Sequence, residues 1–128
     1  METNGKTVLV VEDDLFLRDI LCQKLLKSGY AVEGAIDSEA AFKILEDKKI
    51  DLIILDLLLP GMSGQEILKK IKANSRWQGI PVIIASNLDS AEEKQNCMHL
   101  GAAEYMIKAQ HTPDEIVERA REILAEEK

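Results

Sequence analysis

Short apolar runs alternate regularly with helical patterns along this chain, and this alternation restricts the folds that it can adopt. Runs rich in branched residues predict strands at 7–11, 30–35, 52–55, 81–85 and 104–107. Alternation of this kind favours a parallel sheet with helices on both faces and right-handed crossovers. Five such units are too few for the eight-unit barrel. The sequence therefore predicts an α/β fold with an open, doubly wound sheet of five strands.

The helical segments carry start signals and apolar faces. A serine or threonine followed three residues later by glutamate predicts capping boxes at Ser63, Ser90 and Thr112. We expect Ser38 to cap the second helix. The segment 91–100 has only a weak apolar stripe, formed by Cys97 and Met98. The first helix is expected to bury the residues that recur at helical spacing, which are Leu17, Ile20, Leu21 and Leu25.

The composition limits the classes of function. The 128 residues carry a net charge of -7 and two cysteines without metal-site spacing. An acidic balance argues against nonspecific binding of nucleic acid, which needs basic patches. No apolar run reaches the about 18 residues of a membrane span, and the polar segment 1–6 is unlike a signal peptide. We therefore expect one domain over residues 7–126, in a cytoplasmic protein with reduced thiols.

Polar side chains follow the predicted strands at the points where the strands end. Glu12 and Asp13 follow the first strand, Asp56 follows the third, Ser86 the fourth and Lys108 the fifth. The carboxyl ends of parallel strands lie along one edge of a sheet, which is where open α/β folds bind ligands. Periodicity leaves the strand order open. If the first and third strands are neighbours, Glu12, Asp13 and Asp56 share one pocket.

Three carboxylates in one pocket repel one another, by about 4 kcal/mol for a close pair. Either one of them is protonated or a cation lies among them, and oxygen ligands of this kind favour Mg²⁺ or Mn²⁺. The backbone carbonyl of Leu58 can add a ligand. The Asp56 carboxylate can act as a nucleophile and form an aspartyl-phosphate, while the cation, Lys108 and the Ser86 hydroxyl offset charge on the phosphoryl oxygens. Because no general base is in place, we expect phosphoryl acceptance from a donor rather than rapid turnover.

Several motifs occur together, in order, at these strand ends. They are Val-Val-Glu-Asp-Asp at 10–14, Asp-Leu-Leu-Leu-Pro-Gly-Met-Ser-Gly at 56–64, Ala-Ser at 85–86, Gly-Ala-Ala-Glu-Tyr at 101–105, and Lys108. From about residue 6 to residue 126 the chain resembles the receiver domain of two-component response regulators, the family of the single-domain chemotaxis regulator. The resemblance implies a flavodoxin-like sheet of order 2-1-3-4-5 with five helices.

The resemblance also implies a phosphorylation switch. Asp56 would be the phosphoacceptor, served by a sensor histidine kinase or a phosphotransfer protein, and Ser86 and Lys108 would contact the phosphoryl group. The Mg²⁺ ligands would be Glu12 (through water), Asp13 and Asp56. Tyr105 falls at the aromatic switch position and would turn inward when Ser86 moves towards the phosphate. The surface of the fourth helix, fifth strand and fifth helix would then bind a downstream protein or a second copy of the chain.

Three departures from the family pattern lead to further predictions. Ala109 follows Lys108 where most of the family has a proline in a cis peptide, and a cis bond to a non-proline residue costs about 2.5–4 kcal/mol. We therefore predict a trans bond and a different loop after the fifth strand. Asn87 stands where the family has a small residue, so access to the site is narrower. Leu58 and Leu88 occupy positions where polar side chains can place the hydrolytic water, which predicts a long-lived phosphoaspartate.

Three alternative functions compete with this interpretation. A metal-dependent phosphohydrolase also uses an aspartyl-phosphate, but it needs a second acid two residues after the nucleophile, where this chain has Leu58. A flavin-binding electron carrier needs a glycine- and hydroxyl-rich phosphate loop after the first strand, where residues 12–14 are acidic. A docking module that no longer needs phosphorylation is disfavoured by the intact acidic cluster and Lys108. No functional role is assigned to Trp77.

Overall fold

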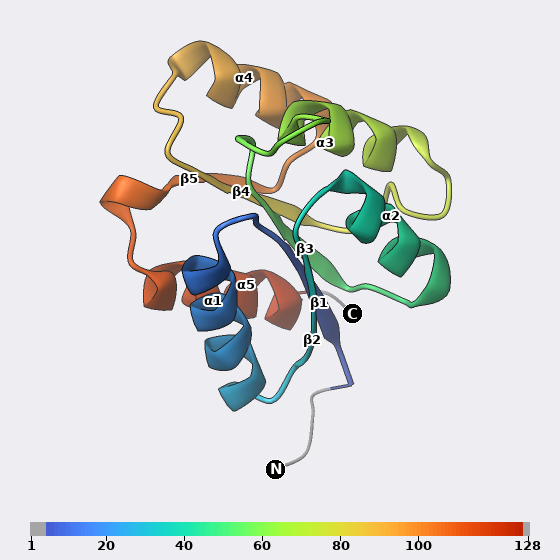
Figure 1. Cartoon of the computed structure of the whole chain (residues 1–128), viewed down its shortest axis with the longest axis vertical. Coiled ribbons are helices and arrows are strands. Elements are labelled where there is room, and N and C mark those ends of the chain that lie inside the picture. Colours follow the sequence, from blue (N-terminus) through green and yellow to red (C-terminus); the bar gives the residue numbers. More distant parts are fainter. Residues whose placement is uncertain (1–4, 127–128) are drawn as a thin grey trace.

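The computed structural model describes residues 5–126, which form a three-layer α/β sandwich (Figure 1). In chain order the elements are β1 (Thr7–Val11), α1 (Leu15–Lys27), β2 (Ala31–Ala35), α2 (Ser38–Asp47), β3 (Leu52–Leu55), α3 (Gly64–Ala73), β4 (Val82–Ser86), α4 (Ala91–Leu100), β5 (Glu104–Ile107), a short 3-10 turn η1 (Lys108–Gln110) and α5 (Pro113–Glu126). The strand order is β2-β1-β3-β4-β5, and every neighbouring pair is parallel. The predicted fold class and strand order are confirmed.

The sheet separates two hydrophobic cores. Successive side chains of a strand point to opposite faces. Leu9 and Val11 of β1 therefore pack with residues of α2, α3 and α4, whereas Val8 and Val10 pack with residues of α1 and α5 (Figure 1). Every residue of β3 is buried, because helices cover both faces of a parallel sheet. This central strand places the residue that follows it, Asp56, in the middle of one edge of the sheet.

The predicted capping boxes each begin a helix. Ser63 and Ser90 accept a hydrogen bond from the backbone N–H three residues further on. At α5 both halves of the box are formed. The Thr112 hydroxyl accepts from the Glu115 N–H at 3.1 Å, and the Glu115 carboxylate accepts from the Thr112 N–H at 2.8 Å. The sequence signals for these three helices were therefore sufficient to locate where each one starts.

Two details of the predicted helices are wrong. Ser38 does not cap α2, because Asp37 holds the extended N-cap position and its carboxylate accepts from the Ala40 N–H at 3.0 Å. Ile20 is 40% exposed. In α4 only Cys97 of the weak apolar stripe is buried, and Met98 is 42% exposed. The sheet and the neighbouring helices cover only the sides of α1 and α4 that carry buried residues such as Leu21 and Cys97.

Three strand limits differ by one residue from the prediction. β2 begins at Ala31 rather than at Tyr30. β4 begins at Val82 rather than at Pro81 and extends to Ser86, which pairs with Ile107 of β5. The trans bond after Lys108 is confirmed, since residues 5–126 contain no cis peptide. The chain continues from β5 directly into η1.

Two predictions from composition can also be compared with the structure. Cys22 and Cys97 are both free thiols, as expected. Across residues 5–126, no helix is long and apolar enough to cross a membrane.

Candidate functional site

The carboxyl ends of the strands form one edge of the sheet, here called the carboxyl rim, which carries Glu12, Asp13, Asp56, Ser86 and Lys108. β1 and β3 are direct neighbours, with Val11 opposite Leu55. The ladder continues one step further, because the Asp56 N–H donates to the Val11 carbonyl at 3.1 Å. Glu12 and Asp56 are therefore the first residues beyond two paired strands, which is why they lie close together.

Three carboxylates meet at this rim. Oxygen atoms of Glu12, Asp13 and Asp56 lie within 4.8 Å of one another. Glu12 is 3% exposed and Asp56 is 5% exposed, whereas Asp13 is exposed. A set made only of carboxylate oxygens is hard and anionic, so its chemistry fits a divalent cation that prefers oxygen ligands. The pocket predicted from the strand ends is present.

Lys108 connects the two buried acids. Its Nζ donates to Glu12 Oε1 at 2.5 Å and to Asp56 Oδ2 at 2.8 Å. The lysine side chain is itself only 15% exposed. Ala109 stands where most of the family has a proline, and the trans bond and the η1 turn still bring the Lys108 amine to the acids. Two buried carboxylates thus share one cation, which is the arrangement that makes burial of their charge tolerable.

Burial and neighbouring charges shift the pKa values of Glu12 and Lys108. Burial raises the pKa of Glu12, and the Asp56 charge adds to that effect against the opposing hydrogen bonds from Lys108 and the Asp14 N–H. Burial alone would lower the pKa of Lys108, but its hydrogen bonds to Asp56 and Glu12 and the charges of these two acids together outweigh burial and raise it. Lys108 therefore stays positively charged at neutral pH.

The loop after Asp56 is held close to the acid. The Leu58 N–H donates to Asp56 Oδ1 at 3.1 Å, so both oxygens of Asp56 have a donor. The Gly64 N–H donates to the Leu57 carbonyl at 3.0 Å. A Cβ at Gly64 would clash with the Asp56 backbone oxygen and lie 2.5 Å from the Leu57 Cα. Gly64 thus lets the start of α3 pack directly against the backbone that carries Asp56.

Ser86 and Tyr105 both contact the loop that follows β4. Ser86 is fully buried, and its hydroxyl accepts from the Leu88 N–H at 3.3 Å. The Tyr105 hydroxyl donates to the Leu88 carbonyl at 2.6 Å, and the residue is 6% exposed. The tyrosine ring is therefore already inward in this structure. The two predicted switch residues are linked through the backbone of Leu88.

Other predicted positions have different environments. Leu58 is 55% exposed and Asn87 is exposed, whereas Leu88 packs partly against the core. Sequence reasoning missed Arg18, whose Nη1 donates to the Glu12 backbone carbonyl at 2.7 Å. The only available signal was a cation one turn into the helix that follows the acidic loop. It also missed the exposed Phe16 at the start of α1, which is 82% exposed.

A buried aspartate shares a lysine with a second acid at the carboxyl rim of a 2-1-3-4-5 sheet, and this combination defines a class of α/β domain. The family model described as "Response regulator receiver domain" matches residues 8–121. The chain therefore belongs to the response regulator receiver domain family.

Individual relatives agree with this assignment. The chain is 32% identical over 120 residues to the phosphate regulon transcriptional regulatory protein PhoB of Pseudomonas aeruginosa, covering 94% of this chain and 52% of that protein. It thus spans about half the length of the curated relatives that it matches. A CheY-like receiver domain from Methanospirillum hungatei superposes with a TM-score of 0.86 at 30% identity, covering 94% of each chain. The BeF3-activated N-terminal receiver domain of Klebsiella pneumoniae RstA has a TM-score of 0.83 at 27% identity, covering 93% of this chain and 98% of that one.

Proposed function

We propose that this domain, over residues 7–126, accepts a phosphoryl group on Asp56 from a sensor histidine kinase or a phosphotransfer protein. The observation that carries the proposal is the contact of Lys108 Nζ with the buried Asp56 carboxylate, beside two further acids. A carboxylate oxygen of Asp56 forms the new bond to phosphorus while the P–N bond of the donor phosphohistidine breaks. The leaving imidazole keeps the bond's electron pair and takes up a proton.

The acids of the rim are also the proposed metal ligands. Glu12 (through water), Asp13, Asp56 and the Leu58 backbone carbonyl would hold Mg²⁺, or Mn²⁺ in its place. When bound, the cation offsets charge on the phosphoryl oxygens. Lys108 supplies a fixed positive charge from the protein, and it remains protonated because its pKa is raised. Together these groups favour the charge that develops on the transferring phosphoryl group.

The hydrogen bonds of Ser86 and Tyr105 to the Leu88 backbone connect the phosphorylation site to the surface of the domain. Ser86 would contact a phosphoryl oxygen through its hydroxyl. In this structure the same hydroxyl accepts a hydrogen bond from the Leu88 N–H. Tyr105 is bonded to the carbonyl of the same residue. Movement at Ser86 would therefore change the population of Tyr105 arrangements and of the surface formed by α4, β5 and α5. That surface would bind a downstream protein or a second copy of the chain.

Two alternatives make different predictions. A phosphohydrolase would need a second acid at position 58, where the structure has an exposed leucine. Without such an acid we expect signalling by a phosphorylated state rather than turnover of a substrate. A docking module that does not need phosphorylation would keep its partner-binding surface in one arrangement. The RstA receiver, described as BeF3-activated, supports the phosphorylated interpretation for this chain.

Intact mass spectrometry after treatment with acetyl phosphate tests the proposal. With Mg²⁺ the wild-type chain should gain the mass of one phosphoryl group, whereas Asp56→Asn and wild type in excess chelator should gain none. Equal labelling of Asp56→Asn would place the acceptor elsewhere. Absence of labelling in wild type, with beryllofluoride also producing no spectral change, would favour the docking module.

A further inference from the structure

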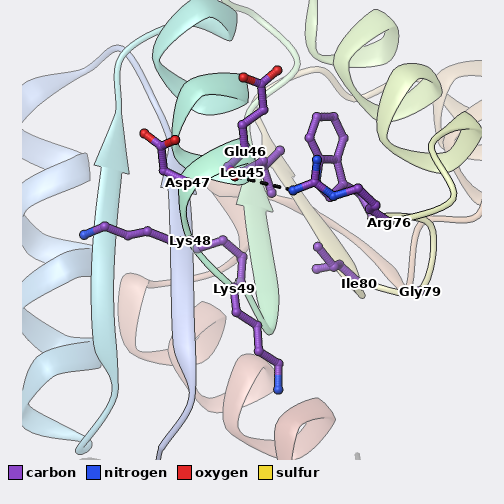
Figure 2. A pocket seen from close by; sticks show the side chains of 10 residues that line it. Leu45, Glu46, Asp47, Lys48, Lys49, Arg76, Gly79 and Ile80 are labelled. Atoms are coloured by element: carbon purple, nitrogen blue, oxygen red, sulfur yellow. Dashed lines mark hydrogen bonds between the residues drawn. The ribbon is translucent and has the colours of Figure 1, made fainter.

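The opposite edge of the sheet, at the amino ends of the strands, carries a pocket that the phosphorylation chemistry does not use. Here this edge is called the amino rim. The pocket has a volume of about 450 Å³ and is lined by residues 45–50 and by the turn that carries Arg76 and Trp77 (Figure 2). Ile50 precedes β3 and Ile80 precedes β4, whereas Asp56 follows β3. A four-residue strand separates the two ends of β3 by about 13 Å.

The buried part of the pocket wall is apolar, whereas five of the ten lining residues are charged. Leu45, Ile50 and Trp77 are buried residues that line it. The Trp77 ring stacks on Phe42 of α2, with ring centroids 5.8 Å apart and an interplanar angle of 21°. A pocket of this size is large enough to hold a small molecule.

Two polar groups at this wall lack the partners that their chemistry favours. Among residues 5–126, the Trp77 Nε1–H is the buried side-chain group without a hydrogen-bond partner. Arg76 lies over the Trp77 ring at 5.9 Å and makes a long 3.4 Å hydrogen bond to the Glu46 carbonyl. No carboxylate pairs with Arg76 within the described part of the chain. Lys48, by contrast, already pairs with Glu33 at 2.6 Å.

The wall is fixed by internal hydrogen bonds. The Trp77 N–H donates to the Asn74 carbonyl at 3.1 Å, and the Ile80 N–H donates to the Trp77 carbonyl at 2.9 Å. Lys72 Nζ donates to the carbonyls of Gln78 and Ile80, at 3.0 and 2.8 Å. Because the turn is already ordered, a ligand that binds there loses little affinity to ordering of the protein.

We infer that this pocket binds a small aromatic monocarboxylate. The apolar wall and the Trp77 ring suit a flat hydrocarbon body, and the Arg76 guanidinium suits a carboxylate. Glu46 and Asp47 also lie at the rim, and in Figure 2 their carboxylates point away from the Arg76 guanidinium. Of the three cations that line the pocket, Lys48 lies 2.6 Å from Glu33 and Lys49 lies 3.9 Å from Asp51, so Arg76 is the one without a carboxylate partner among the described residues. With two acids and one unpaired cation at the rim, a single negative charge is favoured over a multiply charged anion such as a phosphate ester.

Nuclear magnetic resonance can test this because the chain has one tryptophan, so a proton–nitrogen correlation spectrum holds a single indole signal. Benzoate is the probe, and benzamide, which has the same shape without the charge, is the control. Benzoate should shift the indole signal to saturation with a Kd of about 1 mM or tighter. Benzamide should bind at least about fivefold more weakly, since it loses the charge-assisted hydrogen bonds.

Two variants with the same change of charge complete the test. Arg76→Gln should weaken benzoate binding by about fivefold and leave benzamide unchanged. Arg121→Gln, on α5 and outside the pocket, should leave both affinities unchanged. Each variant keeps Trp77, so its indole and backbone signals also report that the fold is intact. A non-saturating benzoate shift, equal binding of benzamide, or equal weakening by Arg121→Gln would each overturn the inference.

Discussion

The two rims of the sheet differ in what they bury. At the carboxyl rim Glu12, Asp56 and Ser86 are all buried, and the two acids share Lys108. At the amino rim the charged residues around the pocket are exposed, and the buried wall is apolar apart from the Trp77 N–H. Buried charge is tolerated only with partners, and buried titratable groups with shifted pKa values cluster at functional sites. The carboxyl rim therefore has the features of a reactive site. The amino rim has the composition of a recognition site.

The largest difference between the rims concerns phosphorylation itself. Asp56→Asn should abolish labelling by acetyl phosphate, because it removes the nucleophilic carboxylate. Arg76→Gln at the amino rim should be labelled like wild type. Intact mass over a time course measures both. Loss of labelling in the Arg76 variant would show that the two rims are coupled.

Substitution of Lys108 should have the next largest effect on the rate of labelling. Lys108→Ala removes the fixed positive charge that contacts Asp56, so the rate of labelling should fall by about a hundredfold. Lys49→Ala removes a lysine from the amino rim and should leave the rate unchanged. Initial rates at equal Mg²⁺ concentration make this comparison. A Lys108→Ala rate within a factor of two of wild type would contradict the role proposed for the amine.

One glycine-to-alanine substitution at each rim tests how tightly that rim is packed. Gly64→Ala would press a Cβ into the backbone of Asp56 and Leu57, and we expect it to lower the free energy of unfolding by about 2–3 kcal/mol. Gly79 has nothing within 4 Å of an added Cβ. Gly79→Ala should therefore raise stability slightly, by at most about 1 kcal/mol. Urea denaturation of both variants, with the slopes compared, decides whether the carboxyl rim is the more constrained one.

The lifetime of the phosphorylated state tests the predicted effect of Leu58, which lies two residues after Asp56. Leu58→Gln introduces a polar group that can hold water, and we expect it to shorten the phosphoaspartate lifetime by about tenfold. Leu26→Gln is the matched control, because Leu26 and Leu58 are each 55% exposed. Decay of the labelled mass in Mg²⁺ gives both lifetimes. A wild-type lifetime of seconds would reject the prediction of a long-lived phosphoaspartate.

The last prediction concerns the buried thiol of Cys97 in α4. Burial, with a further contribution from Glu93, raises the pKa of Cys97 to about 11. Its thiolate fraction is therefore small at pH 8 and rises only as the pH approaches that value. Alkylation at pH 8 should be slower at Cys97 than at the less buried Cys22 by at least about tenfold. Peptide mapping measures the two rates, and faster modification of Cys97 would show that α4 opens readily.

The local parts of this structure could be read from the sequence because short-range rules govern them. Ser63, Ser90 and Thr112 begin helices as their spacing predicted. The error at Ser38 arose because two adjacent residues, Asp37 and Ser38, can both act as caps. The exposure of Ile20 and Met98 depends on how far neighbouring elements extend over each helix, which periodicity does not encode.

By itself the sequence determined the alternation of strands and helices and which polar residues stand at the strand ends. Only the tertiary structure decided that β1 lies beside β3, that Lys108 reaches both Glu12 and Asp56, and that Tyr105 is turned inward. The pocket beside Trp77 also appears only there, since its two lining segments are separate in the chain. The physical reason is range: caps and periodicity act over a few residues, whereas strand order and contacts between distant loops depend on packing of the whole sheet.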